Sequence, residues 1–197
     1  RRSLEILRQP LEDKVIRISR VYGTYDFPAD FMLCAAMNPC PCGHYPDMNR
    51  CRCTPAQVMQ YLGRISQPLL DRLDLCAEVS PVDFEGLSSG RKGESTQTIR
   101  ERVICAQDIQ RERYKIEGIQ FNGELSGAQI EKYCKMEKDA RQLLKMAFQN
   151  MPFSARAYHR ILKVARTIAD MEATESIHRH HIAEALSYRA FDKKYWN

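Results

Sequence analysis

Residues 31–53 read FMLCAAMNPCPCGHYPDMNRCRC, an apolar run that leads directly into four closely spaced cysteines. The run FMLCAAM (31–37) is apolar on both faces, as in a strand buried in the middle of a sheet. We therefore expect a β-strand that ends at Asn38. The segment GHYPDMNR (43–50) is rich in turn-forming residues, which predicts a compact loop between the cysteine pairs.

The cysteines Cys40, Cys42, Cys51 and Cys53 follow the pattern C-x-C-x8-C-x-C. Two close pairs joined by a short loop can fold back so that their sulfurs converge, and four thiolates suit tetrahedral Zn²⁺. Four protein ligands leave no position for water, so the predicted site is structural. The alternatives are four free thiols or two labile disulfides, and a zinc site in which His44 replaces one cysteine.

Composition places the chain among soluble globular proteins of the cytoplasm. Its 197 residues are 44% hydrophobic and 28% charged, which argues against general disorder. No apolar run approaches the length of about 20 residues that spans a bilayer, and the start RRSLEILRQPLED lacks the apolar region of a signal peptide. In a reducing compartment, clustered cysteines are more often metal ligands or redox groups than disulfides. The net charge of +5 permits contact with phosphates without demanding it.

The chain separates into three regions by sequence pattern. Residues 1–83 contain the segments with strand-like patterns, which are VIRIS (15–19), the alternating LDLCAEV (73–79) and the run 31–37 described above. Residues 84–98 are rich in Gly, Ser and charge and read as a linker. Residues 99–197 follow helical periodicity. The expected fold class is α+β, a mixed α/β portion followed by an all-α helical bundle.

Serines mark the starts of three expected helices in the last region, at Ser126, Ser154 and Ser176. Another helix is expected over EKDARQLLKMAFQ (137–149). The remaining cysteines stand singly in apolar or amphipathic segments and are expected to behave as small hydrophobes: Cys34, Cys76, Cys105 and Cys134.

Three polar residues outside the cluster are candidates for function. Asn38 follows an expected strand directly, where a polar amide orients a water or contacts a phosphate, or merely caps a turn. Arg72 is flanked by Asp71 and Asp74, so a local salt bridge is the simpler interpretation. Arg156 lies in the first turn of an expected helix, where a cation opposes the helix dipole unless an anion is near; the alternative is an exposed arginine.

HRHH (178–181) is interpreted as an ordinary polar helix face rather than a metal site.

These segments resemble the C-terminal half of magnesium-chelatase-related AAA+ ATPases of the ComM/YifB type, over essentially the whole chain. The segment LEILRQPLEDKVIRISRVYGTYDFPADFMLCAAMNPCPCG resembles the family's region after Walker B, with a β-hairpin and a sensor-1 strand that ends at Asn38. CTPAQVMQYLGRISQPLLDRLDLCAEV resembles the part that carries the arginine finger, here Arg72, and SARAYHRILKVARTIADME resembles the sensor-2 helix of the lid, with Arg156. The resemblance implies that residues 1–83 are the C-terminal portion of an AAA+ α/β core with a zinc-knuckle-like insert, and that residues 99–197 are the helical lid.

The sequence departs from the family in one large respect. It contains no G-x-x-x-x-G-K-[ST] and no apolar strand ending in Asp-Glu, so the groups that would hold ATP and Mg²⁺ are absent. We expect a fragment that begins after Walker B and does not hydrolyse ATP by itself. In the longer protein the resemblance implies a homo-oligomeric ring, a hexamer, with nucleotide between subunits. It also implies DNA handling with branch migration in natural transformation. Some relatives insert magnesium into porphyrins, and the cysteine cluster favours the DNA-linked branch.

Two other hypotheses remain open. The chain is a non-enzymatic zinc-containing module that binds nucleic acid or protein, or it is a thiol redox protein, which requires an exposed thiol of low pKa. Arg50 and Arg52, beside Cys51 and Cys53, would lower a thiol pKa or contact DNA phosphates.

Overall fold

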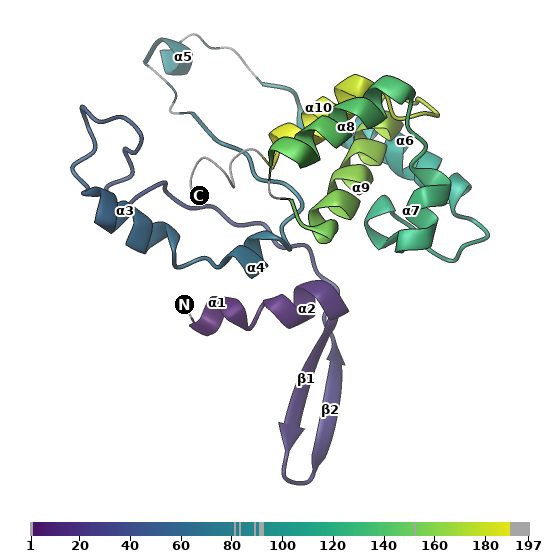
Figure 1. Ribbon diagram of the computed structural model, residues 1–197, viewed down its shortest axis with the longest axis horizontal. Coiled ribbons are helices and arrows are strands. Elements are labelled where there is room, and N and C mark those ends of the chain that lie inside the picture. Colours follow the sequence, from purple (N-terminus) through teal and green to yellow (C-terminus); the bar gives the residue numbers. More distant parts are fainter. Residues whose placement is uncertain are drawn as a thin grey trace. The chain divides into compact units, whose positions relative to one another are not determined.

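The computed structural model describes residues 2–80, 82, 84–88, 90, 93–151 and 153–189. These residues fall into two compact units whose boundary in the sequence lies between Leu73 and Asp74, and each is described by itself. Helices combine with a small two-stranded antiparallel sheet, which confirms the expected mixture of α and β structure at that level (Figure 1).

The N-terminal unit (residues 2–73) consists of short elements joined by long extended segments. Its elements are α1 (Arg2–Glu5), α2 (Arg8–Asp13), β1 (Val15–Arg20), β2 (Gly23–Pro28), α3 (Pro55–Leu62) and α4 (Gln67–Leu70).

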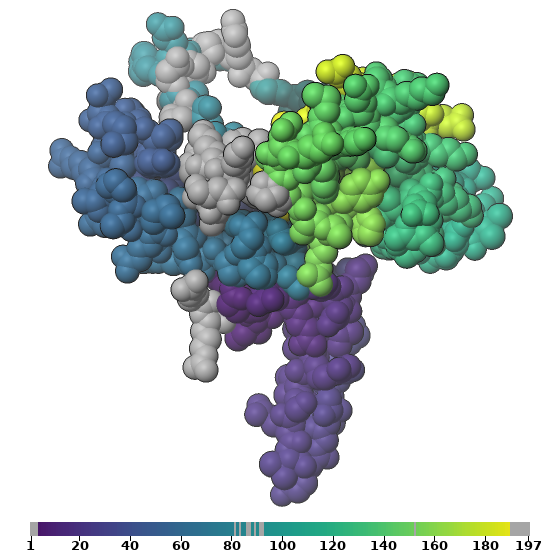
Figure 2. All heavy atoms as spheres, in the orientation of Figure 1, coloured from purple at the N-terminus to yellow at the C-terminus, as the bar shows by residue number. Residues whose placement is uncertain are grey.

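Strands β1 and β2 form an isolated hairpin, so the strand expected over VIRIS is confirmed. Ile16 opposes Phe27 and Ile18 opposes Tyr25, which places aliphatic and aromatic side chains together on one face. These side chains are exposed, and the hairpin stands clear of α1 and α2 beyond its base (Figures 1 and 2).

The strands expected over 31–37 and 73–79 are not formed, and this part of the prediction was wrong. Both segments are extended but lack any ladder, and Phe31, Met32 and Leu75 are exposed. A strand that is apolar on both faces needs a hydrogen-bonded neighbour along each edge. Within the described part of the chain, the only sheet is the β1–β2 hairpin, so such neighbours are missing.

The named elements of the C-terminal unit (residues 74–189) are helices, and α5 and the start of α6 lie within the segment 84–98 that was expected to be an irregular linker. Its elements are α5 (Phe84–Ser88), α6 (Thr96–Arg113), η1 (Asn122–Glu124), α7 (Gly127–Tyr133), α8 (Lys138–Asn150), α9 (Ala155–Met171) and α10 (Arg179–Ser187).

Two of the three expected serine caps are confirmed. Ser154 Oγ accepts a hydrogen bond from the Ala157 backbone N–H at 3.2 Å and begins α9, and Ser126 begins α7. The last helix starts later than expected, because His178 and not Ser176 is the N-cap of α10.

A continuous apolar core lies around α9 in the C-terminal unit. The side chains on the α9 stripe pack against residues of α7, α8 and α10 and of the α6 C-terminus, so the amphipathic pattern of the sequence is confirmed. The buried residues are Tyr114, Leu125, Ile130, Cys134, Ala140, Leu144, Ile161, Leu162, Ala165, Ile168, Ala169, Ile177, Ile182 and Ala185.

Of the single cysteines, Cys134 is buried as expected and Cys76 is half-buried, whereas Cys34 and Cys105 are exposed. None of the described helices combines the length and the apolar character needed to cross a bilayer.

Candidate metal centre

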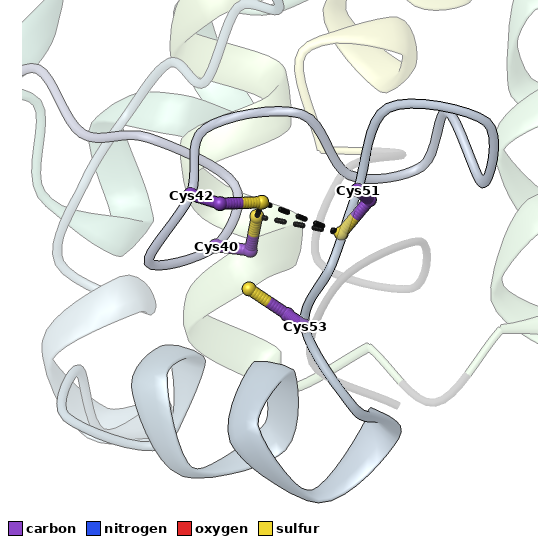
Figure 3. A group of neighbouring side chains, drawn as sticks. All are labelled: Cys40, Cys42, Cys51 and Cys53. Carbon is purple, nitrogen blue, oxygen red and sulfur yellow. Dashed lines mark hydrogen bonds between the residues drawn. The ribbon is translucent and has the colours of Figure 1, made fainter.

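The four clustered cysteines bring their sulfurs together in the N-terminal unit (Figure 3). All four Sγ atoms lie within 4.8 Å of one another, and His44 is not part of the group. Cys40 and Cys42 lie on one arm of the loop, Cys51 lies on the facing arm, and Cys53 lies close to the start of α3. The prediction from spacing that the sulfurs converge is therefore confirmed.

The separations of the sulfurs fit a tetrahedral ion. The Sγ of Cys40 lies 3.4 Å from that of Cys42 and 3.8 Å from that of Cys51, and the Cys42 and Cys51 sulfurs are 3.6 Å apart. Four sulfurs at a Zn–S distance of about 2.3 Å in a tetrahedron are separated by about 3.8 Å. The group can hold a metal ion, and the donor set and spacing are compatible with zinc.

Local backbone structure shapes the first arm of the cluster. Gly43, with φ of +82°, closes a turn in which its N–H donates to the Cys40 carbonyl at 3.1 Å. A residue with a Cβ is strained in this left-handed conformation, which explains glycine between Cys42 and the loop.

Helix α3 fixes the second arm. Its N-cap Thr54 directly follows Cys53 and exchanges hydrogen bonds with Gln57 in a capping box, at 2.9 and 3.3 Å. Val58 and Leu62 on the buried face of α3 pack against Cys40. Helix α3 therefore packs against the cluster through a small apolar core.

The surroundings of the thiols shift their pKa values in opposite directions. The backbone N–H groups of His44 and Arg52 lower the pKa of Cys42 to about 6. A backbone hydrogen bond at Cys42 also favours the Cys53 thiolate, but desolvation and the neighbouring sulfurs outweigh it and raise the pKa of Cys53 to about 12. Four thiolates this close to one another repel, so they cannot all form by themselves. A divalent cation removes this repulsion because it stabilises every thiolate at once.

An N–H donor supports the most buried sulfur. The Tyr45 backbone N–H points to Cys40 Sγ at 3.4 Å, and Cys40 itself is fully buried. Donors of this kind stabilise negative charge on a metal-bound sulfur and orient the ligand.

Asn38 lies next to the cluster rather than at the end of a strand. Its side chain is exposed, and its amide group lies 3.8 Å from the position that a Cβ on Gly43 would take. The structure thus places this candidate beside the turn that carries Cys40 and Cys42.

Arg72 is nearly buried and bound within the N-terminal unit. Its side chain is 9% exposed and pairs with Glu12, not with either flanking aspartate. It also donates to the carbonyls of Arg8 at 3.1 Å and Pro68 at 2.6 Å. The guanidinium therefore ties α2 to α4.

Arg156 occupies the first turn of α9, as the sequence predicted, and is exposed. It belongs to the C-terminal unit, whereas Asn38 and Arg72 belong to the N-terminal unit.

A second cluster joins Glu172 to the histidines of HRHH. His180 Nε2 and His181 Nε2 each lie 2.9 Å from Glu172 Oε2. His181 is fully buried, so the interpretation of the whole segment as a polar face was wrong for this residue. Its Nδ1 accepts the His178 backbone N–H at 3.0 Å, so in the neutral ring Nε2 carries the proton and donates to Glu172. The neutral His181 ring then has no free lone pair for a metal, and its hydrogen bond to Glu172 links α10 to the C-terminal end of α9.

Sequence reasoning missed a buried polar network in the C-terminal unit. The carboxylate of Asp170 accepts hydrogen bonds from Arg113, Arg166 and Asn122. Burial lowers the pKa of Arg166, and Asp170 offsets this only in part. A signal was present: Arg166 and Asp170 stand four apart on the apolar stripe of α9, where a solvated pair is not expected.

The chain matches two parts of one protein family. Residues 1–87 match magnesium chelatase, subunit ChlI, and residues 93–189 match the magnesium chelatase, subunit ChlI C-terminal region. The match covers the segments on which the resemblance in the sequence was based.

Similar full-length proteins come from several bacteria. The chain is 45% identical to Uncharacterized protein YifB of Salmonella typhimurium over 195 residues, 98% of this chain. It is 44% identical over 191 residues, 96% of this chain, to Competence protein ComM of Haemophilus influenzae. Uncharacterized protein YifB of Escherichia coli is 42% identical over 195 residues, again 98% of this chain. The chain spans 36–37% of the length of these relatives.

Proposed function

Because the chain belongs to the magnesium chelatase subunit ChlI family, together with YifB and ComM, we propose that it is part of an ATP-driven AAA+ motor that acts on DNA. The observation that carries this proposal is the 44% identity to a competence protein over 96% of the chain. Competence links that relative to DNA uptake, so branch migration of DNA is the proposed work of the motor. The chain contains no phosphate-binding loop, so ATP binding falls to the rest of a longer protein, which forms a hexameric ring.

Three side chains have proposed roles at the nucleotide. Asn38, which is exposed, positions the attacking water beside the γ-phosphate. Arg72 stabilises transition-state charge in the neighbouring subunit, as an arginine finger does. Arg156, at the positive end of the α9 dipole, binds an anion there and couples the nucleotide to the lid.

The contacts of Arg72 add a condition to its role. To reach a neighbouring nucleotide, its guanidinium must leave Glu12 and the two carbonyls that hold it here. A phosphoryl group carries more charge than one carboxylate, so in this proposal it competes with Glu12 for the guanidinium once ATP is present.

Substitution of Arg72 in the longer protein tests the proposal. Arg72→Ala is expected to lower ATP turnover by about 10³-fold or more while ATP binding stays nearly unchanged. Glu12→Gln is the matched control, because it removes the other half of the ion pair and leaves the arginine in place. If Arg72 only ties α2 to α4, the two variants lose turnover alike. If Arg72 acts on nucleotide, Glu12→Gln keeps most of the turnover.

The role of Arg156 is tested by mixing subunits. Arg156→Ala is expected to leave the lid folded, because substitution of an exposed surface residue usually changes stability by less than about 0.5 kcal/mol. Turnover falls, and it returns in part when these subunits are mixed with subunits that carry a disabled Walker B acid, provided that Arg156 acts across the subunit boundary. No recovery indicates action within one subunit, and wild-type turnover of the single variant removes the role.

We also propose that the cysteine cluster binds one structural Zn²⁺. The convergence of the four sulfurs is the observation that favours a non-enzymatic zinc module as the second candidate function. The chain purified without added zinc should contain one zinc ion, and its cluster thiols should resist alkylation until the metal is removed. His44→Ala should keep the metal and Cys42→Ser should lose it. Substoichiometric zinc with freely reacting thiols would favour the thiol redox hypothesis, for which the pKa of Cys42 of about 6 is suitable.

A further inference from the structure

A solvent-open hollow of about 290 Å³ lies beside the cysteine cluster, within the N-terminal unit. One wall is the loop that carries the cluster and the other is the exposed side of α3 and the residues that follow it. The lining residues are Pro41, Cys42, Arg52, Cys53, Gln57, Gln60, Tyr61 and Arg64.

Two arginines in the hollow are exposed and are not neutralised by a carboxylate. Across residues 38–66 the only acidic residue is Asp47, and its side chain accepts the Asn49 backbone N–H at 3.0 Å. Within the described part of the chain, neither Arg52 nor Arg64 forms an ion pair. Many other arginines do, namely Arg8, Arg17, Arg72, Arg102, Arg111, Arg113, Arg160 and Arg166.

Tyr61 gives the hollow a fixed planar platform. Its ring is partly buried and packs against the small core of Cys40, Val58 and Leu62. The Arg64 guanidinium carbon lies 5.3 Å from the ring centroid, which is a cation–π contact. This contact favours one position of the exposed guanidinium before any ligand arrives.

These features match one ligand chemistry. A guanidinium binds a phosphodiester, an aromatic–guanidinium platform stacks on a base, and the Gln60 amide can hydrogen-bond a base edge. The volume lies at the lower end of the range for small-ligand sites, about 300 Å³, which suits one nucleotide unit. A duplex hides its base faces, so the stacking platform favours a single strand.

Resting on the proposal that the longer protein acts on DNA, we infer that this hollow binds one nucleotide unit of single-stranded DNA, with Arg52 on the phosphate and Arg64 stacked on the base. The alternative use of the arginines is to offset the negative charge that four thiolates leave around one Zn²⁺. The two uses differ in what a substitution changes, because only the second alters metal retention.

The test uses the zinc-loaded 197-residue chain and a fluorescent oligodeoxythymidine, with binding followed by anisotropy at several salt concentrations. Arg64→Ala should weaken binding about tenfold or more, and Arg64→Lys, which keeps the charge without the plane, should recover only part of the loss. Arg52→Ala should weaken binding and lower the salt slope by about 0.7. Arg100→Ala removes the same charge from an exposed position on α6 and should have no effect.

Several outcomes overturn the inference. They are wild-type binding by the Arg52 and Arg64 variants, loss of zinc in step with loss of DNA, or a duplex bound as tightly as the single strand. If the chain binds DNA but both variants match wild type, the hollow is not the binding site and DNA binds elsewhere on the protein. The motor proposal is judged separately by ATP turnover in Arg72→Ala, which does not depend on this hollow.

Discussion

The two units keep their side chains in place by different means. The C-terminal unit buries a continuous apolar core. A network of buried, hydrogen-bonded ion pairs around Asp170 lies beside this core. Around its loop, the N-terminal unit has a buried cluster of only Cys40, Val58 and Leu62, next to the other three clustered thiols. A core so small cannot by itself offset the entropy of ordering the loop. On the proposal that the cluster binds zinc, the loop of the N-terminal unit should depend on the ion, whereas the C-terminal unit depends on packing.

Metal removal should separate the two units most clearly. Structural zinc contributes about 10–16 kcal/mol of apparent binding energy to small zinc folds, so a chelator or Cys40→Ser should unfold the loop over 38–53. The helices of the C-terminal unit should stay protected. Amide hydrogen exchange followed by mass spectrometry resolves the two regions. Loss of protection in α9 and α10 on chelation would show that the units do not differ in this way.

The reverse experiment removes the centre of the ion network. Asp170→Ala leaves Arg166 buried without its carboxylate, at a cost of about 3–5 kcal/mol. Thermal unfolding of the C-terminal helices should shift strongly downward while zinc content stays at the wild-type level. Asp108→Ala is the control, because its pair with Arg111 is exposed on both sides and contributes at most about 1 kcal/mol. Equal shifts for the two variants would contradict the importance of the buried network.

Glycine substitutions offer a matched pair across the units. Gly43 (φ +82°) and Gly118 (φ +69°) are both left-handed, and an added Cβ meets nothing closer than 3.8 Å at Gly43 and nothing within 4 Å at Gly118. Alanine at either site should therefore cost about 1–2 kcal/mol of backbone strain and no clash. Gly43→Ala should weaken zinc affinity about tenfold, and Gly118→Ala should leave it unchanged, as measured by competition with a chromophoric chelator. Equal effects on zinc would mean that the strain is not local.

The same contrast explains what the sequence could predict. Helices α7 and α9 begin at local serine caps, and α7, α8 and α9 each bury apolar side chains within this chain, so the sequence pattern located them. The convergence of the cysteines followed from their spacing and the short loop between them. The strand expected over 31–37 failed because a ladder requires partners that no local pattern reveals.

Ion pairs between residues far apart in the chain could not be predicted from the sequence either. Arg72 pairs with Glu12, sixty positions away, although two aspartates flank it. Asp170 stands close to Arg166 in the chain, but its pairing with Arg113 depends on how α6 packs on α9. Local charge patterns predict the nearest partner, and packing then selects a different one.

The smallest predicted effect concerns pH and an ion pair of the C-terminal unit. Hydrogen bonds from Lys132, then Tyr133 and Gln129, lower the pKa of Glu117 to about 2 from its usual 4.5. A carboxyl with a depressed pKa in the folded state adds stability that is present above the unfolded pKa and lost as the pH falls from 4.5 through 2. Glu117→Gln removes this contribution at every pH. The difference in melting temperature between wild type and Glu117→Gln should therefore shrink across that interval and vanish near its lower end.

Far-UV circular dichroism reports this transition, because the C-terminal unit holds most of the described helix. Glu131→Gln makes the same change at an exposed site on α7, and its curve should run parallel to that of wild type. Protons compete with zinc for thiolates, so the N-terminal unit should release its metal before this interval is reached. Acid should then act in two steps, first on the ion-dependent loop and later on the packed helices. A single step, or a Glu117→Gln difference that does not vary with pH, would mean that the two units share one source of stability.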